Sequence, residues 1–268
     1  MFRKIFLLFI CTMTLAACNR QSAVLLDEPK HQQQSEIDLR TKEAIPASFF
    51  PEPLKVVAIG DSLTEGVGSS KRNGGYLPYL ETMLVEETLL HSADISNFGI
   101  KGNRTDQLLK RLNTAELKLE IEKSDAVIIT IGGNDVMKVV RDNIMNLKME
   151  PFIDARVEYE SRLKDIIAKV RSSNPDAEIY LVGLYNPFSR YLGELDVIMS
   201  AWNSSSEAVL SGFENTHFIQ IGDVFKNSKE DLLFTEDYFH PNDRGYELIA
   251  TQIYRQMEQY SIKEYAYK

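Results

Sequence analysis

Apolar runs of strand length alternate with amphipathic stretches along the chain from residue 54 onward. The apolar runs predict β-strands over residues 54–60, 93–98, 125–131, 178–184 and 217–221. The stretches between them predict helices over residues 76–90, 105–122, 154–172, 195–213 and 243–260, the second of them broken near Asn113. Five strands separated by helices are typical of an α/β domain, in which a parallel sheet carries helices on both faces.

Two segments stand out from this alternation. The third predicted strand contains Ala126–Ile131, which is almost entirely apolar and therefore suits a strand buried on both faces. Residues 141–152 contain two methionines and Pro151 but show no clear period. They predict a long loop, or an insertion beside the functional site.

The first seventeen residues have the pattern of a signal peptide. Arg3 and Lys4 precede an apolar run, Ile5 to Ala16, that is too short to span a bilayer comfortably. The run ends in Leu15-Ala16-Ala17-Cys18, and small residues before a cysteine resemble the lipobox of bacterial lipoproteins, which implies lipidation of Cys18. The alternative is an ordinary secretory signal that contains a cysteine. The lipobox predicts an extracytoplasmic protein, held on the bacterial cell membrane by lipid chains that do not span it.

The segment that follows has the composition of a flexible tether. Residues 18–53 lack sustained apolar periodicity and contain prolines at positions 46, 51 and 53. We therefore expect a signal peptide over 1–17, a tether over 18–53 and one α/β domain over 54–268. Removal of the signal peptide would leave Cys18 as the sole cysteine, so no internal disulfide is expected.

The amino-acid composition and net charge exclude few classes of binding partner. The hydrophobic content of 44% and charged content of 26% are ordinary for a globular protein. The net charge of -9 argues against nucleic acid as a partner, because nucleic acid selects basic surfaces.

A serine lies two residues after the first predicted strand, in Gly60-Asp61-Ser62-Leu63. Open parallel sheets carry their functional sites at the carboxyl ends of their strands. The hydroxyl of Ser62 would become a nucleophile once a base removed its proton. Gly60 permits a tight turn there, and Asp61 can hold it by accepting backbone N–H groups. Taken alone, the tetrapeptide can equally be a turn without chemistry.

The candidate base is His240, which lies in a loop before the last predicted helix. Asp237, three residues earlier, can orient the imidazole through a local turn. Glu236 and Asp243 are the alternative orienting carboxylates. The other histidines stand at positions 31, 91 and 217, in the predicted tether, at a helix end and at a strand start.

Three hydrogen-bond donors follow successive predicted strands and can stabilise an oxyanion together. They are the backbone N–H groups of Ser62 and Gly102 and the side-chain amide of Asn134. The alternatives are an ordinary loop glycine and a helix N-cap asparagine. We expect Asp135 to cap the helix that follows it.

Four segments, taken in order, carry a family resemblance. Ala58–Thr64, Asn97–Gly102, Gly132–Asp135 and Asp237–Asn242 resemble the four sequence blocks of the SGNH (GDSL-type) hydrolase superfamily. The similarity covers residues 54 to about 260 and is to lipoprotein esterases and acylhydrolases of this superfamily. It implies a flavodoxin-like three-layer α/β/α sandwich with strand order 2-1-3-4-5.

The resemblance also implies a role for each candidate residue. Ser62 is expected to be the nucleophile, His240 the base and Asp237 its partner. Ser62, Gly102 and Asn134 are expected to form the oxyanion hole, with Gly99 as the alternative glycine. The expected reaction is ester hydrolysis through an acyl-serine intermediate, without a metal or other cofactor.

The substrate stays open at this stage. Acylated saccharides, lysophospholipids and other acyl esters all fit an anchored esterase. The aromatic residues between Tyr185 and Trp202 could line an acyl or sugar pocket, or pack the helices instead. A surface binding module on the same scaffold is the alternative function. A flavin or phosphate binder is disfavoured, because Asp61 and Glu65 place carboxylates where a phosphate would lie.

Overall fold

The computed structural model describes residues 53–71, 74–86, 90 and 92–262. The predicted signal peptide, Cys18 and the tether as far as residue 52 lie outside the described residues. The strands are β1 (Leu54–Gly60), β2 (Ala93–Gly99), β3 (Ala126–Thr130), β4 (Glu178–Val182) and β5 (Thr216–Ile219). Each lies within two residues of its predicted bounds. For β3, whose residues are all buried, the reason is that a buried parallel strand is a continuous apolar run with sharp ends.

The strands form one parallel sheet in the order β2-β1-β3-β4-β5. Gly60 at the end of β1 lies opposite Gly99 of β2 on one side and Thr130 of β3 on the other. The carboxyl ends of these three strands are therefore level at one edge of the sheet. The α/β fold, the five-stranded parallel sheet and its predicted strand order are confirmed.

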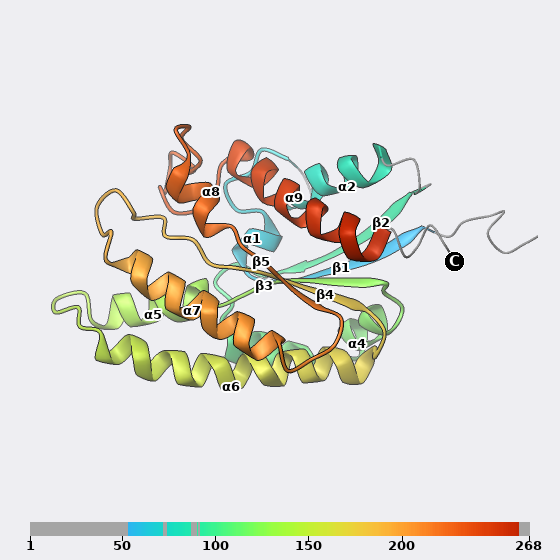
Figure 1. Cartoon of the computed structure of the whole chain (residues 1–268), viewed down its shortest axis with the longest axis horizontal. Helices are drawn as coiled ribbons and strands as arrows, with labels where there is room; N and C mark the ends of the chain where they lie inside the picture. Colours follow the sequence, from blue (N-terminus) through green and yellow to red (C-terminus); the bar gives the residue numbers. More distant parts are fainter. Residues whose placement is uncertain (1–52, 72–73, 87–89, 91, 263–268) are drawn as a thin grey trace, which may run out of the picture. The chain divides into compact units, whose positions relative to one another are not determined.

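Helices connect the strands and flank the sheet (Figure 1). Their bounds are α1 (Ser62–Glu65), α2 (Leu77–Glu86), α3 (Thr105–Arg111), α4 (Ala115–Glu122), α5 (Gly133–Asp142), α6 (Glu150–Ser173), α7 (Leu195–Leu210), α8 (Gly222–Asn227) and α9 (Asp243–Met257), which continues into a π-helical turn, Glu258–Ile262. The predicted break near Asn113 separates α3 from α4. Helices α1 and α8 were not predicted, because such short helices offer too few turns to establish a period. Helix α5 was expected only as the helix that Asp135 would cap, without bounds.

The prediction of a long loop over residues 141–152 is wrong at both ends. Helix α5 continues to Asp142 and α6 begins at Glu150, so only residues 143–149 form the connection. Pro151 lies in the first turn of α6, where its missing N–H would have no helical partner in any case. Met145 is an apolar residue in this connection, yet it is 95% exposed, so it does not follow the helical spacing of buried apolar residues. For this reason the methionines obscured the helical period in the sequence.

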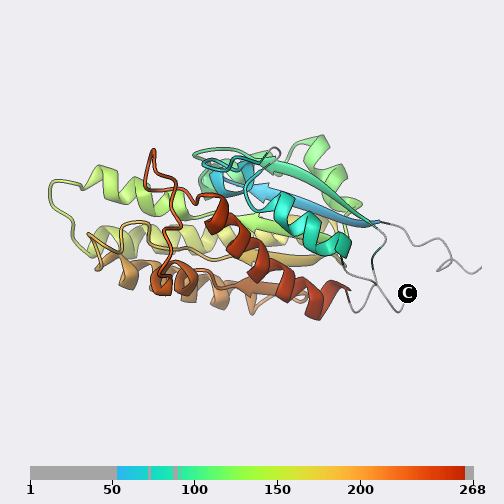
Figure 2. The same ribbon diagram turned by 90° about the horizontal axis from the view of Figure 1, so that it is seen from above.

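Two apolar layers pack against opposite faces of the sheet. One contains residues of α3 to α7, among them Leu163, Ile166 and Trp202. The other contains residues of α2 and α9, among them Leu80 and Ile253. Seen from above, α2 and α9 lie side by side across the strands (Figure 2). No helix among the described residues is long and apolar enough to cross a lipid bilayer.

Candidate active site

The turn after β1 places Ser62 above the carboxyl edge of the sheet. Gly60 has a φ of +144°, and a Cβ there would lie only 2.0 Å from the Thr130 carbonyl oxygen, so only glycine fits. Asp61 then caps α1 by accepting a hydrogen bond from the Leu63 N–H at 3.0 Å. Ser62 is the first residue of α1 and is 4% exposed.

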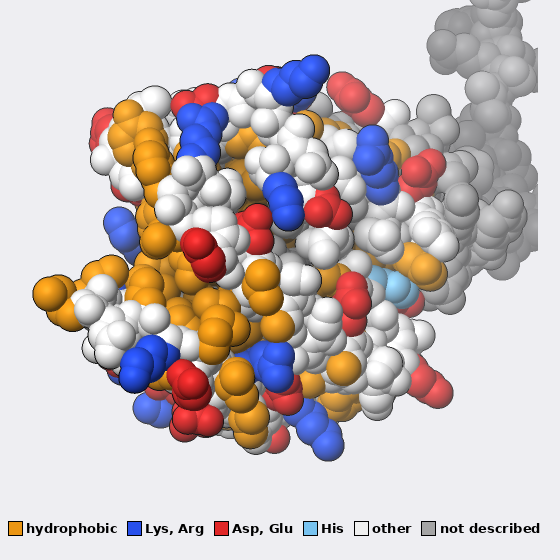
Figure 3. All heavy atoms as spheres, turned by 60° about the vertical axis from the view of Figure 1, so that its left-hand side comes forward, with side chains coloured by type: hydrophobic (Ala, Val, Ile, Leu, Met, Phe, Trp, Pro, Cys, Tyr) orange, Lys and Arg blue, Asp and Glu red, His pale blue; other side chains and the backbone are white. Residues whose placement is uncertain are grey.

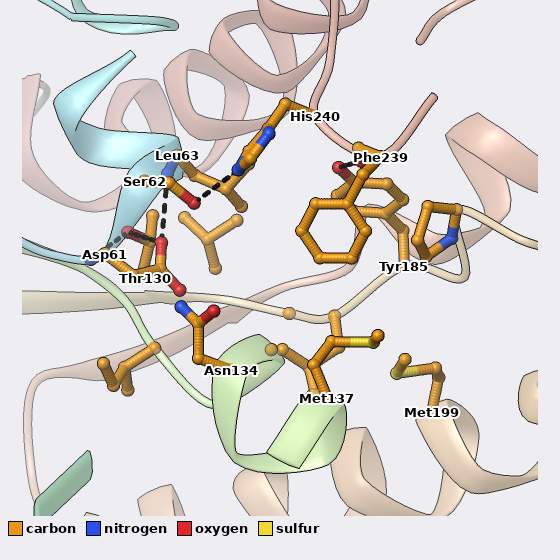
Figure 4. A pocket seen from close by; sticks show the side chains of 16 residues that line it. Asp61, Ser62, Leu63, Thr130, Asn134, Met137, Tyr185, Met199, Phe239 and His240 are labelled. Carbon is orange, nitrogen blue, oxygen red and sulfur yellow. Dashed lines mark hydrogen bonds between the residues drawn. The ribbon is translucent and has the colours of Figure 1, made fainter. Parts of the chain in front are cut away.

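Ser62, His240 and Asp237 form a continuous hydrogen-bonded line. His240 Nε2 lies 2.9 Å from Ser62 Oγ (Figure 4). On the other side of the ring, His240 Nδ1 lies 2.6 Å from Asp237 Oδ2. Because an ionised carboxylate only accepts, Nδ1 carries the ring proton and Nε2 accepts from the serine hydroxyl. This tautomer is the one that a base for Ser62 requires.

Local backbone geometry holds the carboxylate in place. Asp237 Oδ1 accepts the backbone N–H groups of Phe239 and His240 at 2.9 and 3.0 Å, which closes a tight turn. Burial opposes ionisation of Asp237, but the hydrogen bonds from His240 and Phe239 outweigh it and lower the pKa of Asp237. The ionised carboxylate is therefore favoured beside the imidazole.

Among the described residues, the rival carboxylates form no hydrogen bond with the imidazole. Asp243 accepts hydrogen bonds from the side chains of Ser69 and Ser70. Glu236 is exposed and has no hydrogen bond to His240 among the described residues. Of the carboxylates considered from the sequence, Asp237 is the one joined to the ring.

Two of the candidate oxyanion donors are unpaired backbone groups. Among the described residues, neither the Ser62 N–H nor the Gly102 N–H donates to a protein acceptor. The Gly99 N–H, by contrast, donates to Asn97 Oδ1 at 2.9 Å, which leaves Gly102 as the glycine with a free donor. Gly102 lies on an exposed turn with a φ of +79°.

The third candidate donor is a side chain that points from α5 toward the serine. Asn134 Nδ2 donates one hydrogen bond to the Asn103 carbonyl at 3.0 Å and has a second hydrogen to spare. Ser62, Asn134 and His240 line the same hollow, whereas Gly102 is outside its lining and next to the bonded Asn103.

The hollow beside Ser62 is mostly apolar. Ser62, His240 and Asn134 surround one end of it, and Met137 of α5 and Met199 of α7 surround the other (Figure 4). It encloses about 520 Å³, including the part open to solvent. The remaining lining residues are Asp61, Leu63, Thr130, Ile131, Gly133, Val182, Gly183, Leu184, Tyr185, Pro187 and Phe239.

The aromatic residues after β4 were predicted either to line a pocket or to pack helices, and the structure shows one example of each. Tyr185 lines the hollow, stacks on Phe225 and donates its hydroxyl to the Phe239 carbonyl at 2.6 Å. Trp202 is buried in the core against Tyr159, so it packs helices instead. Tyr191 is 85% exposed.

The remaining predicted positions lie elsewhere. His217 of β5 is bonded to Glu178 Oε2 and stacks against Tyr180, away from the carboxyl edge of the sheet. His31 and His91 lie outside the described residues. Among the described residues, no group of three or more His, Cys, Asp and Glu side chains could hold a metal ion.

One sequence prediction is corrected and two residues were missed. Asp135 does not cap α5, which contains it, but accepts hydrogen bonds from Thr105 at the start of α3. Met137 and Met199 were not predicted to line the site. A helical period counted from Asn134 would have found Met137, because residues three apart share a helix face.

A sequence profile of the GDSL-like Lipase/Acylhydrolase family matches residues 58–248, a span that contains every residue of this hydrogen-bonded site. The chain belongs to this family. Its members are ester-hydrolysing enzymes, and the expected SGNH resemblance is thereby confirmed at the family level.

Two relatives of this GDSL-family protein come from bacilli. It is 39% identical to the uncharacterized protein YpmR of Bacillus subtilis, over 76% of this chain and 81% of the relative. It is 26% identical to the spore germination lipase LipC of Bacillus licheniformis, over 75% of this chain and 94% of that one.

Solved structures share the fold of this GDSL-family protein at lower identity. The lipase Lip_vut3 from a goat rumen metagenome is 24% identical with a TM-score of 0.70, covering 78% of this chain and 99% of its own. A catalytic mutant of Axe2, an acetylxylan esterase of Geobacillus stearothermophilus, is 23% identical with a TM-score of 0.60 and covers 78% and 95%. At these identities the likeness shows the fold alone.

Proposed function

We propose that this protein is a serine esterase that hydrolyses carboxylic esters through an acyl-serine intermediate. The observation that carries the proposal is the line from Ser62 Oγ through the His240 ring to Asp237, with distances of 2.9 and 2.6 Å. It opens into an apolar hollow that also contains the Asn134 amide. Acyl transfer requires a nucleophile, a base, an acid that orients the base and a free hydrogen-bond donor, all at one point.

In the first half-reaction, His240 Nε2 takes the proton of the Ser62 hydroxyl while Oγ bonds to the acyl carbon. The negative charge that forms on the carbonyl oxygen is stabilised by donors, for which Ser62 N–H, Gly102 N–H and Asn134 Nδ2 are proposed. Collapse of this intermediate breaks the bond to the alcohol oxygen. His240 gives its proton to that oxygen, and the alcohol leaves.

In the second half-reaction, the same groups hydrolyse the acyl-serine. His240 Nε2 removes a proton from water as the water oxygen attacks the acyl carbon. The bond to Ser62 Oγ then breaks and His240 returns the proton to it, which releases the carboxylic acid. Asp237 stays ionised throughout and stabilises the charged imidazole.

The apolar hollow supports a substrate with an acyl chain of several carbons. Leu184, Met137 and Met199 offer no fixed hydrogen bonds for a sugar hydroxyl. Exposed apolar side chains of loops on the same side of the molecule, including Met145 and Tyr191, add to this character. Hydrophobic side chains gather on that side in Figure 3. We therefore propose a lipid-like ester, in keeping with the lipase LipC, over an acetylated saccharide.

Steady-state hydrolysis of p-nitrophenyl acetate, butyrate and octanoate by the full-length protein tests this function. We expect turnover of butyrate and octanoate esters that disappears in Ser62→Ala. Activity retained in Ser62→Ala would overturn the acyl-serine mechanism. Absence of turnover, together with absence of Ser62 labelling by a fluorophosphonate, would instead indicate a binding module on this scaffold.

We also propose that the protein is a lipoprotein anchored through Cys18. The support is the lipobox-like sequence Leu15-Ala16-Ala17-Cys18 after a short apolar run. Incorporation of a labelled fatty acid in a bacterial host is expected for the wild type and should be absent in Cys18→Ala. Equal incorporation by the two proteins would rule out this anchor.

A further inference from the structure

The N-termini of α3 and α5 are joined by a buried cluster beside the candidate oxyanion donors. Asp135 Oδ2 accepts the Thr105 backbone N–H at 3.0 Å, and Asp135 Oδ1 accepts the Thr105 hydroxyl at 2.6 Å. Both residues are buried, with exposures of 6% and 0%. Asp135 therefore caps a helix from a different part of the chain, thirty residues away.

A third side chain closes the cluster from α6. Arg162 Nε donates to Thr105 Oγ1 at 2.8 Å, and Arg162 Nη2 lies 3.5 Å from Asp135 Oδ1. The Thr105 hydroxyl accepts from the arginine and donates to the carboxylate, so it acts as acceptor and donor at once. Replacing this hydroxyl with a methyl group would break both bonds at once.

The neighbouring residue makes a parallel connection to the same loop. Asn134 Nδ2 donates to the Asn103 carbonyl at 3.0 Å, while Asp135 holds Thr105 two residues further along. Adjacent residues of α5 thus bind the loop that carries Gly102, at Asn103, and the first residue of the helix that follows it, Thr105. These two connections link the helix that carries the Asn134 amide to the segment that carries the Gly102 N–H.

We propose that Asp135 and Thr105, supported by Arg162, are positioning residues that set the geometry of the oxyanion donors. None of the three lines the hollow that contains Ser62. Their effect is on transition-state stabilisation, because donors must already point at the oxyanion when charge develops. A displacement of about 1 Å at such a site can cost roughly 100-fold in rate. This inference rests on the proposed esterase function.

Steady-state kinetics of Thr105→Val on p-nitrophenyl butyrate tests the proposal. We expect kcat to fall about 10- to 100-fold, in proportion to the misplacement of the donors, with KM changed less than threefold. Thr105→Ser keeps the hydroxyl and should return kcat to within about threefold of the wild type. The pH profile of kcat/KM should keep its acid limb, because the contacts of His240 to Ser62 and Asp237 are not altered.

Thr216→Val is a matched control for loss of stability. The Thr216 hydroxyl donates to the Leu210 carbonyl at 2.9 Å at the start of β5, the opposite end of the sheet from the site. The Thr216→Val substitution should lower the melting temperature while kcat stays near the wild-type value. Equal loss of kcat in the two valine variants, in step with the folded fraction, would overturn the positioning role.

The outcomes separate this inference from the proposed function. If the wild type turns over butyrate in a Ser62-dependent manner and Thr105→Val has the wild-type kcat, the positioning role fails and the esterase stands. If Ser62→Ala is as active as the wild type, the proposed function fails, and the positioning role fails with it.

Discussion

Thr130 at the end of β3 donates its hydroxyl to the buried carboxyl group of Asp61 at 3.0 Å, across two adjacent strands. With Thr130 donating to Asp61, Thr64 must donate to Thr130 and Tyr76 to Thr64, in contacts of 2.8 and 2.9 Å. This chain of hydroxyl groups supports the turn that carries Ser62 from below. It also places the carboxyl group of Asp61 directly before the nucleophile, Ser62. The chain of bonds contains hydroxyl groups and no basic partner for this carboxyl group.

Stability should depend on pH through Asp61. Burial raises the pKa of Asp61 to about 7, against the opposing hydrogen bonds from Leu63 and Thr130. Between its unfolded value of 3.8 and that folded value, the folded state holds the extra proton. The linked stabilisation is complete below 3.8 and is lost as the pH rises through about 7.

Asp61→Asn removes this linkage and keeps an oxygen that accepts from Leu63 and Thr130. The free energy of unfolding of Asp61→Asn, relative to the wild type, should rise by about 2–4 kcal/mol between about pH 4 and pH 8. Urea denaturation of both proteins across this range measures the difference. A difference that does not change with pH would contradict the assignment.

Gly60→Ala should prevent stable folding. The new Cβ would meet the Thr130 carbonyl oxygen at 2.0 Å, and a φ of +144° is unfavourable for alanine. We expect a loss of at least about 3 kcal/mol in the free energy of unfolding, because the paired strands leave no room for relaxation. Gly193→Ala is the control, since its nearest atom is 3.8 Å away. Similar melting temperatures for the two variants would disprove the clash.

Asn134→Ala should lower kcat by about 100- to 1000-fold while the protein stays folded. The reason is loss of the amide that lines the hollow beside Ser62. Asn143→Ala is the matched control at the other end of α5, where Asn143 Nδ2 donates to the Val139 carbonyl at 2.9 Å. Esterase assays measure kcat of both variants. An equal kcat in the two would show that Asn134 has no role in the oxyanion hole.

Met199→Trp should shorten the acyl chain that the enzyme accepts. Met199 and Met137 border the end of the hollow away from Ser62, so a larger side chain there leaves room for acetate but not for octanoate. We expect kcat/KM for p-nitrophenyl octanoate to fall at least about 10-fold more than that for acetate. Met145→Trp, on the exposed connection, is the control. A uniform decrease across chain lengths would place the acyl chain elsewhere.

Short-range relationships were the most predictable from the sequence. Asp237 and His240 are three residues apart in one loop, so a single turn brings them together whatever the rest of the chain does. Strands β1, β3 and β4 were predictable because a strand buried on both faces has few alternatives to an apolar run. The start of α6 was not predictable, because Met149 and Pro151 conceal the first turn of a helix whose outer face is solvated.

The sequence by itself determined the order of apolar and amphipathic elements, hence the parallel sheet, and the residue types that meet at its carboxyl edge. Tertiary structure alone decided which donors stay unpaired, that Trp202 packs in the core while Tyr185 borders the hollow, and that Asp135 caps α3 rather than its own helix. The physical reason is that the way whole helices pack determines which side chains contact one another across an α/β fold. Local pattern specifies each helix, but not which residues of two helices face one another.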